Sequence, residues 1–338
     1  MKLEATTDKA ISFLFGGSRH RTWPPYEIVE DTLEATARGK LEKLERLYHK
    51  GQDLSWDGRE VLSSLIAKHG PPRLPEDKKA SALLLLGILL WGELAAWAIS
   101  ADLAERIEDV EAKMAATSQA HDEARHFYVL RDYVRALGEP IPRLGGVGRT
   151  LLLGILETDS LVHKLIGMQL MVEANALAIF KSLGAANLEP VLTDLLPYYE
   201  RDEARHVGLG VLYLPRLLGK LTRLEAARAT AFQIRCVGLL ISAGLPMRPH
   251  LQNLGIEPRK MAERVVALQD EIFGQMRETA RLDGSTWVGG FVNPKGGAGP
   301  NLLELVHPPG GIDAATPLHR AFLNTWTAGA RIADRALA

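Results

Sequence analysis

The pentapeptide Asp-Glu-Ala-Arg-His occurs twice in the chain, at residues 122–126 and again at residues 202–206. Thirty residues before the glutamate of each copy, a further glutamate lies within an apolar stretch: Glu93 precedes Glu123, and Glu173 precedes Glu203. The whole pattern therefore repeats with an offset of 80 residues. An internal unit of two helices that occurs twice predicts a four-helix bundle.

Helical spacing brings the polar residues of these motifs to a common centre. Two side chains that are three residues apart lie on one face of a helix, with about 5–6 Å between their Cβ atoms. Glu123 and His126 can therefore reach one metal ion, and the second motif repeats this pair. A step of 30 residues down one helix and up its antiparallel neighbour brings the upstream glutamates to the same height. The predicted metal ligands are Glu93, Glu123, His126, Glu173, Glu203 and His206.

Metal coordination explains why Glu93 and Glu173 can lie within apolar helices, since a lone buried carboxylate is heavily penalised. Four glutamates also offset the charge of two divalent ions. An oxygen-rich ligand set with two imidazoles suits iron or manganese better than structural zinc, which prefers thiolate or imidazole ligands. The sequence therefore predicts two iron ions, with manganese or a mixed Mn/Fe pair as the alternatives.

The remaining charged residues of the two motifs are predicted to support the ligands. Asp122 and Asp202 each lie four residues before a motif histidine, on the same helix face, where they can accept its free ring N–H. Arg125 and Arg205 would balance the charge of these aspartates. A single Glu-x-x-His on a charged helix is usually a solvated pair, whereas the doubled motif with matched upstream glutamates is far more specific.

Residues one helical turn from a predicted ligand are expected to border the metals. Most of them are apolar, which favours an apolar or aromatic substrate, although ordinary core packing explains the same residues. Tyr199 is expected to act as a hydrogen-bond partner for a ligand bound there. The predicted pocket residues are Trp97, Gln119, Leu130, Gln169, Leu177, Tyr199 and Gly210.

Apolar periodicity and chain breakers predict the helices of the bundle. Gly138-Glu139-Pro140 ends the second helix, Gly184 is placed to cap the third, and the break from Pro140 to Arg149 is the longest connection among them. The glycines at 145–148 lack the Gly-Lys-Ser/Thr ending of a phosphate loop and are assigned to this crossover. The four segments are about 79–103, 107–137, 152–183 and 189–218.

Further helices are expected outside this bundle. An amphipathic one is predicted at about 31–50, two more at about 221–243 and 258–282, and a short one at about 317–337. The stretch 288–311, rich in glycine and proline, is predicted to be an extended loop. No segment is predicted to be a strand, so the fold class is all-α. The expected organisation is an N-terminal helical extension at 1–75, the di-metal bundle at 76–220 and C-terminal helices packed on the bundle at 221–338.

Composition excludes several classes of protein. Hydrophobic residues make up 46% and charged residues 24%, which is the balance of a soluble globular chain. The net charge is −1 and no long basic run occurs, so no nucleic acid is expected as a partner. One cysteine, Cys236, excludes an intramolecular disulfide framework and a thiolate metal cluster. Residues 1–11 lack the apolar core of a signal peptide, and a cytoplasmic setting is expected.

The stretch from Ala80 to Ala101 is long enough to span a bilayer, and Glu93 is its only charged residue. A glutamate near the middle of a membrane span is costly, and the charges on the two flanks are balanced. This stretch is therefore predicted to be a buried bundle helix, and no membrane span is expected.

With these motifs, residues 79–218 resemble the ferritin-like, non-haem di-iron carboxylate superfamily, which includes the small subunits of ribonucleotide reductases. The Asp-Glu-x-Arg-His form is most similar to that of bacterial di-iron monooxygenases, acyl-carrier-protein desaturases and aerobic cyclases of chlorophyll synthesis. The resemblance implies a ferritin-like bundle with one long crossover between its second and third helices. It also implies activation of dioxygen at the metal pair.

The chain departs from individual members of that superfamily at three positions. Leu130 stands where ribonucleotide reductases carry a radical tyrosine, and Leu177 stands where hydrocarbon hydroxylases carry a threonine. Tyr199 replaces an additional histidine ligand of arylamine N-oxygenases. Direct transfer of those three reactions is therefore in doubt.

The function that the resemblance implies is a di-iron oxidase or monooxygenase acting with O2 on a small organic substrate. Its electrons would come from a reductase, a ferredoxin or the substrate itself, and a homodimer is one expected assembly. The alternative is a metal-binding protein for iron storage, ferroxidase activity or peroxide defence, without an organic substrate. The residues added before and after the bundle favour the enzyme, whereas a large cage would favour the alternative.

Overall fold

The computed structural model describes residues 35–282 and 298–337, and the side chains of residues 42–281 and 301–337. The chain separates into two compact units, Met1–Gly39 and Lys40–Ala338. Within the described residues every regular element is a helix and no strand occurs, which confirms the all-α fold class. The division into three parts at residues 75 and 220 remains a prediction.

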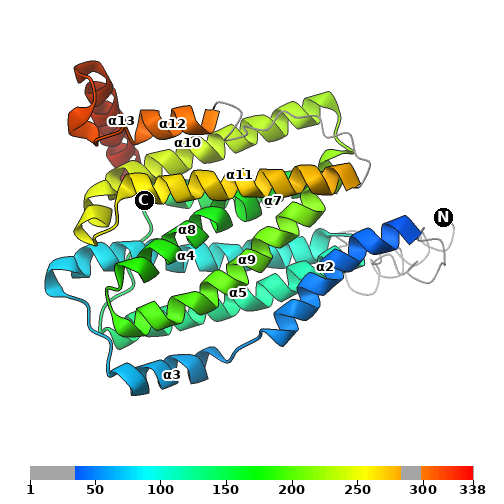
Figure 1. Cartoon of the computed structure of the whole chain (residues 1–338), viewed down its shortest axis with the longest axis horizontal. Helices are drawn as coiled ribbons and strands as arrows, with labels where there is room; N and C mark the ends of the chain where they lie inside the picture. The colour runs from blue at the N-terminus through cyan, green and yellow to red at the C-terminus, as the bar shows by residue number, and fades with distance from the viewer. Residues whose placement is uncertain (1–34, 283–297, 338) are drawn as a thin grey trace, which may run out of the picture. The chain divides into compact units, whose positions relative to one another are not determined.

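Four long helical segments of the second unit form the bundle (Figure 1). They are α4 (Glu76–Arg106), α5 (Val110–Ala136), the segment that ends in α8 (Glu173–Ala186), and α9 (Pro190–Leu218). α4 packs along α5, α8 packs along α9, and α5 contacts α9. This arrangement is a ferritin-like four-helix bundle, in which the two-helix unit of the sequence repeat occurs twice.

The third bundle segment differs from the single helix predicted at 152–183. Residues 146–157 form a separate helix, α6 (Gly146–Glu157), within the crossover. The bundle segment itself begins at Ser160, whose side chain caps α7 (Leu161–Leu165). It then continues as a π-helical stretch, η2 (Ile166–Val172), and as α8. The break occurs because Thr158-Asp159-Ser160 places residues that favour N-caps between two apolar runs.

The start of α9 is fixed to α5 by one buried carboxylate. Glu189 accepts hydrogen bonds from the backbone N–H groups of Val191 and Leu192, and Pro190 occupies the first helical position. The hydroxyl of Tyr133, on α5, donates to the same carboxylate at 2.9 Å. This contact sets where α9 begins along α5, and therefore the height at which the two pentapeptides face each other.

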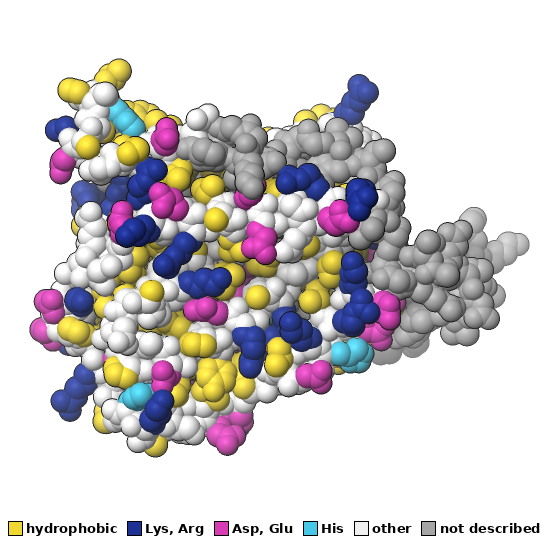
Figure 2. Space-filling view, in the orientation of Figure 1, with side chains coloured by type: hydrophobic (Ala, Val, Ile, Leu, Met, Phe, Trp, Pro, Cys, Tyr) yellow, Lys and Arg dark blue, Asp and Glu magenta, His cyan; other side chains and the backbone are white. Residues whose placement is uncertain are grey.

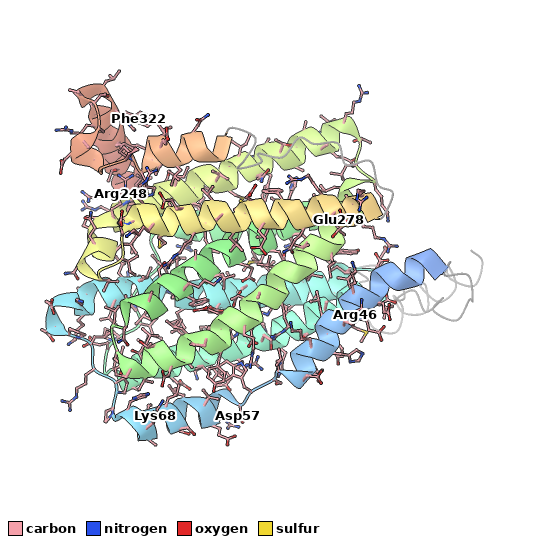
Figure 3. The ribbon with its side chains drawn as sticks, in the orientation of Figure 1. Arg46, Asp57, Lys68, Arg248, Glu278 and Phe322 are labelled. Carbon is pink, nitrogen blue, oxygen red and sulfur yellow. The ribbon has the colours of Figure 1, made fainter. Side chains whose placement is uncertain are left out.

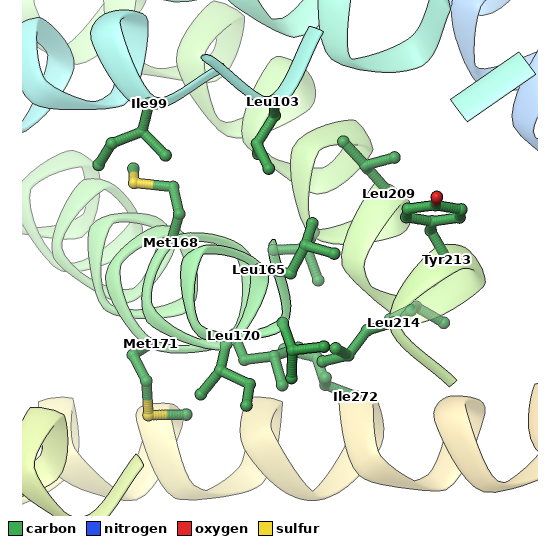
Figure 4. Close-up of a cluster of buried hydrophobic side chains, with 14 of the residues drawn as sticks. Ile99, Leu103, Leu165, Met168, Leu170, Met171, Leu209, Tyr213, Leu214 and Ile272 are labelled. Carbon is green, nitrogen blue, oxygen red and sulfur yellow. The ribbon is translucent and has the colours of Figure 1, made fainter. Parts of the chain in front are cut away.

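Two buried apolar clusters fill the interior of the bundle and of its surroundings. The first gathers side chains of α4, η2, α9 and α11, and Figure 4 shows Ile99, Leu165, Leu209 and Ile272 within it. The second lies around the other half of α4 and α5 and includes Tyr133. Burial of such side chains stabilises by about 1.5–3 kcal/mol each, so these clusters hold the bundle helices in place.

Two described helices, α4 and α10 (Arg223–Asn253), are long and apolar enough to cross a membrane by length and composition alone. Half of the most apolar stretch of α4 is buried inside the protein, and this helix carries the buried Glu93. For α4 these observations favour the predicted bundle helix over a membrane span.

The added helices lie on both sides of the bundle. α3 (Gly58–His69) follows α2 (Ala35–Asp53) and packs on α5 and α9, while α11 (Pro258–Leu282) packs on α8 and α9. α10 contacts α4, α6 and η2, and α13 (Pro317–Ala336) packs on α6 and α10. Charged side chains of both signs are interspersed over the face drawn in Figure 2. That face therefore shows no basic patch of the kind that binds nucleic acid.

Three predicted boundaries were wrong. α8 continues past Gly184 to Ala186 and ends at Asn187, which has a left-handed φ of 46°. α10 extends beyond 243 to Asn253, although it contains two prolines. The loop predicted at 288–311 contains α12 (Ala298–Val306), because residues 301–306 are apolar enough to pack on α11. Residues 288–297 of that loop lie outside the described residues, and the 3-10 turn η4 (Ile312–Ala314) follows it.

Candidate metal centre

The six predicted ligands are brought together in the interior of the bundle. Each of the four bundle segments contributes at least one of them, and none is more than 5% exposed. Glu173 is the first residue of α8, directly after the π-helical stretch. The contributions are Glu93 from α4, Glu123 and His126 from α5, Glu173 from α8, and Glu203 and His206 from α9.

The ligand atoms form two overlapping groups, and within each group they lie within 4.8 Å of one another. One group contains Glu93 and His126, the other contains Glu173 and His206, and Glu123 and Glu203 belong to both. Two groups that share two carboxylates are the arrangement expected of two neighbouring ions with bridging ligands. The cluster is therefore able to bind a dinuclear metal site.

Several ligand atoms have no hydrogen-bond partner within the protein. Such unpaired atoms show whether the cluster has room in its bonding for metal ions. Oε2 of Glu123, Nδ1 of His126 and Oε1 of Glu203 are buried and make no hydrogen bond. Nδ1 of His126 lies 3.1 Å from Oε1 of Glu203 and 3.3 Å from Oε2 of Glu93, without the geometry of a hydrogen bond. Buried polar atoms left unpaired are costly, and a cation among them would satisfy all three.

Burial and mutual repulsion act strongly on the titration of these carboxyl groups. Burial raises the pKa of Glu93 and of Glu173 well above the usual range, and the other cluster carboxylates raise it further. Burial also opposes ionisation of Glu123, but the charges of His206 and His126 hold its pKa below the usual range. Burial lowers the pKa of both histidines, but the facing carboxylates, chiefly Asp202 for His126 and Glu123 for His206, outweigh burial and raise it well above the usual range. Without a cation, the cluster therefore balances its charge by holding protons.

Metal binding is expected to release protons and to weaken as the pH falls. The ion takes deprotonated carboxylates and imidazoles, whereas the raised pKa values of Glu93, Glu173, His126 and His206 keep these groups protonated to a higher pH. Calorimetric titration of metal into the protein, in buffers with different heats of ionisation, measures the protons released. A heat of binding that is independent of the buffer would contradict this expectation.

The aspartates support the histidines crosswise, which corrects the predicted pairing within each motif. Nε2 of His126 lies 3.2 Å from Oδ2 of Asp202, and Nε2 of His206 lies 3.3 Å from Oδ2 of Asp122. Each aspartate is thus the partner of the histidine in the other motif. The reason is that α5 and α9 face each other, so that an aspartate reaches the ring on the opposite helix more directly than the ring one turn along its own. The expected role of orienting the imidazoles is compatible with this geometry.

Both arginines join the two aspartates in a closed, buried network. Arg125 donates to Oδ1 of Asp122 and, at 2.9 Å, to Oδ2 of Asp202. Arg205 donates to Oδ1 of Asp202 at 2.7 Å and to Oδ2 of Asp122 at 2.8 Å. Two cations and two anions therefore connect α5 to α9 directly beside the ligands, and each of these four side chains is at most 6% exposed.

Trp56 also belongs to this network, although no pattern in the sequence indicates it. Its indole Nε1–H donates to Oδ2 of Asp202 at 2.8 Å, and the guanidinium of Arg125 lies 4.8 Å from the ring centroid. Trp56 lies in the connection between α2 and α3, directly before Asp57, which caps α3. No spacing rule relates residue 56 to motifs that lie more than 60 residues further along the chain, so only the tertiary structure shows this contact.

Some of the predicted pocket residues contact a ligand directly or through one neighbour, and others are buried in the bundle. Gln119 donates to Oε1 of Glu173 at 2.9 Å and accepts a hydrogen bond from Gln169 at 3.2 Å. A Cβ atom on Gly210 would lie 2.7 Å from Cβ of Gln169, so the glycine permits this close approach of α9. Leu130 and Leu177 are buried, at 2% and 5% exposure.

Trp97 is not part of the interior, in contrast to the prediction. Its side chain is 39% exposed, and its ring centroid lies 6.4 Å from that of Phe127. The buried face of this part of α4 runs through Glu93, Ala96 and Ile99 at steps of three residues, and Trp97 lies beside this face, towards the surface.

Tyr199 lies beside the metal ligands, but its hydroxyl has a different partner from the expected one. The ring stacks on the imidazole of His126 with centroids 4.4 Å apart, and the hydroxyl donates to the backbone carbonyl of His126 at 2.8 Å. Burial raises the pKa of this phenol well above its usual range. The hydroxyl proton is therefore engaged with the backbone, and the side chain positions His126 instead of donating to a bound ligand.

The comparisons with known proteins support the fold. No family model and no curated protein matches this chain. Among solved structures, a variant of an R2-like ligand-binding oxidase with an aerobically reconstituted Mn/Fe cofactor is similar at 18% identity, with a TM-score of 0.52 over 78% of this chain and 99% of that chain. A second variant, with an anaerobically reconstituted Mn/Fe cofactor, is 20% identical, with a TM-score of 0.53 over 69% of this chain and 92% of that chain. The chain therefore has the ferritin-like fold of R2-like oxidases.

Proposed function

We propose that this protein is a dinuclear non-haem metal oxidase or monooxygenase that uses O2 to oxidise a small apolar or aromatic substrate. The observation that carries the proposal is the convergence of buried, unpaired carboxylate and imidazole atoms from four bundle segments in two overlapping groups. Iron is the proposed metal, with manganese or a Mn/Fe pair as alternatives, because the ligand set is rich in oxygen. A cytoplasmic setting and a reductase or ferredoxin donor are parts of the same proposal.

Each side chain of the cluster has a proposed role. Glu93 and His126 would bind one ion, Glu173 and His206 the other, and Glu123 and Glu203 would bridge them. When bound, iron or manganese supplies the redox electrons with which O2 is reduced. Asp202 and Asp122 hold Nε2 of the two histidines, so that Nδ1 of each ring faces the carboxylates.

The surroundings of the cluster fit oxidation of an apolar molecule. Leu130 and Leu177, each four residues from a ligand in the sequence, are buried, and the bundle helices contribute to two buried apolar clusters. Exclusion of water strengthens the electrostatic interactions inside a site and protects reactive species from side reactions. α10 and α11 also cover parts of α4, α8 and α9, which leaves less of the bundle surface free for packing into a storage cage.

Oxygen uptake by the iron-loaded protein tests the proposal. Protein loaded anaerobically with Fe(II) should retain two ions per chain and consume O2 on mixing. Uptake of many iron ions per chain as a mineral would support iron storage instead. No O2 uptake by protein that holds two ferrous ions would contradict the proposed oxidase.

No long-lived tyrosyl radical should accumulate in that reaction. Oxidation of a tyrosine requires its phenolic proton to leave, and the proton of Tyr199 points at the backbone carbonyl of His126, which is not a base. Leu130 stands at the position where ribonucleotide reductases carry a radical tyrosine, and leucine forms no such radical. Electron paramagnetic resonance of the wild type and of Tyr199→Phe after O2 exposure is the measurement. A persistent tyrosyl signal in the wild type would contradict this expectation; its loss in Tyr199→Phe would assign the radical to Tyr199, and its retention would assign it to another tyrosine.

A further inference from the structure

The helix α13 leaves a largely apolar stripe of side chains exposed. Leu318 is 83% exposed, Phe322 45% and Ile332 68%. A Cβ atom on Gly329 would meet no atom within 4 Å. Figure 3 labels Phe322 on α13, at the upper left of the view, and hydrophobic side chains lie at the surface in the same corner of Figure 2. The stripe consists of Leu318, Phe322, Thr325, Gly329, Ile332 and Ala336, which are all exposed.

The circumference of α13 divides into three sectors, at about 100° per residue. One sector packs on the protein: Leu323 and Ala330 are buried, and the indole N–H of Trp326 donates to the hydroxyl of Ser242, on α10, at 3.0 Å. The stripe is a second sector and contains no charged residue. A surface helix is usually polar wherever it does not face the core, so this sector is expected to face a partner. The third sector is polar and exposed, and it contains Arg320, Asn324, Arg331 and Arg335.

The spacing of the stripe fits a second copy of the same helix. Its members lie alternately four and three residues apart, which is the a/d spacing of paired helices. In one antiparallel register all six residues face one another, and the residues that meet differ in size, so that the two surfaces can interdigitate. A twofold axis forms each of these pairs twice. The facing pairs are Leu318 with Ala336, Phe322 with Ile332, and Thr325 with Gly329.

The exposed area and the charges favour a second copy over a lipid surface. The six residues of two copies together expose on the order of 1,000 Å², which is the size at which specific protein interfaces begin. Pairing through the stripe buries no charge, because the arginines of α13 lie in the polar sector. Helices that bind anionic lipids carry clusters of about 4–8 Lys and Arg. α13, in contrast, has three arginines and one aspartate.

We propose that this stripe is the contact between two copies of the protein, whose α13 helices pair antiparallel about a twofold axis near Thr327. Gly329 permits close approach of the two backbones at the centre of the contact, beside Thr325. A contact of this size should form reversibly, with a dissociation constant on the order of 10 µM. It does not involve the metal cluster and is independent of the proposed oxidase function.

Sedimentation velocity of the metal-loaded full chain tests the association. From about 1 to about 200 µM, around the expected dissociation constant, the wild type should shift from monomer to dimer. Ile332→Asp should weaken association at least tenfold, because each dimer would bury two added charges. Asn324→Asp is the matched control, since it adds the same charge to the polar sector of the same helix and should leave association unchanged. A wild type that stays monomeric, or equal association of the two variants, would overturn the proposal.

Paired cysteines test the register. Residues 318 and 336 lie about 27 Å apart along α13, and in the antiparallel pair each also lies about as far from its own copy. A disulfide requires Cα atoms within about 7 Å. Leu318→Cys/Ala336→Cys should therefore form covalent dimers on oxidation with diamide, whereas each single variant should not. The native Cys236 is buried and should not compete. Linked dimers of a single variant, or none of the double variant, would overturn the antiparallel contact.

Flotation with vesicles of phosphatidylserine and phosphatidylcholine separates a second copy from a lipid surface. We expect the wild type to remain in the vesicle-free fraction at concentrations at which it dimerises. Binding of the wild type to the vesicles that Ile332→Asp abolishes and Asn324→Asp retains would overturn the proposal, because the stripe would then be covered by lipid.

Discussion

Replacement of both Glu123 and Glu203 with alanine is expected to abolish binding of both metal ions. These two residues belong to both groups of ligand atoms, so each group loses two of its four members. The remaining side chains leave each ion with one carboxylate and one imidazole, too few to hold iron or manganese in a defined site. Metal analysis after anaerobic loading should show two ions per chain in the wild type and none in the variant.

The double variant should nevertheless fold, which separates loss of the site from loss of the protein. In the metal-free state, burial raises the pKa of Glu93 and Glu173, and repulsion by the other carboxylates of the cluster raises it further. The apolar clusters that hold the bundle helices are unchanged in the variant, so its circular dichroism without metal should match that of the metal-free wild type. The matched control is Glu111→Ala with Glu200→Ala, on the same two helices but outside the cluster. Two ions bound to the Glu123→Ala/Glu203→Ala variant would mean that the ligands are wrongly assigned.

Asp202→Ala is expected to have the next largest effect, on both stability and metal affinity. Asp202 is fully buried and accepts hydrogen bonds from Arg125, Arg205 and Trp56, in addition to its contact with His126. Removal of one partner from a buried ionic network leaves uncompensated charge and costs about 3–5 kcal/mol. Loss of a carboxylate that orients a metal-binding histidine typically weakens metal affinity about 10–100-fold.

Chemical denaturation and metal titration measure these two effects. Asp194→Ala is the matched control on α9, because Asp194 is 38% exposed and pairs with Lys68 and His69 at the surface. Exposed ion pairs contribute about 0–1 kcal/mol, so this control should be nearly neutral. If Asp202→Ala is as mild as Asp194→Ala, the buried network does not have the role assigned to it.

The crosswise pairing gives Asp202→Ala a further signature. In zinc-loaded, diamagnetic protein, the imidazole nitrogen resonances of His126 should shift in Asp202→Ala, while those of His206 stay close to the wild type. Asp122→Ala should have the opposite pattern, because Asp122 contacts His206. Shifts confined to the histidine within the same pentapeptide would restore the pairing that the sequence suggested.

Helix periodicity and the doubled motif were sufficient to predict the bundle and the meeting of six polar side chains. This part is predictable because spacing within one helix fixes which residues share a face, as for Glu123 and His126. The structure also places Gln119 and Tyr199 beside the ligands, one turn away, as the same rule requires. The fold class followed from the repeat and from the absence of strand patterns.

Contacts between helices were not predictable in the same way. The sequence cannot show that α5 and α9 face each other closely enough for Asp202 to reach His126, nor that Trp56 enters the network from the connection between α2 and α3. The apolar runs on both sides of Thr158-Asp159-Ser160 predict a single helix, so the sequence does not reveal the break between α6 and α7. The exposure of Trp97 shows that one turn of spacing does not fix the direction of a long side chain.

Anomalous diffraction from crystals of the iron-loaded protein is the most direct test of the dinuclear site. We predict two iron peaks inside the bundle, one among Glu93, Glu123, His126 and Glu203 and the other among Glu123, Glu173, Glu203 and His206. A single peak, no peak in fully loaded protein, or peaks outside these two groups would contradict the assignment of a dinuclear metal centre to this cluster.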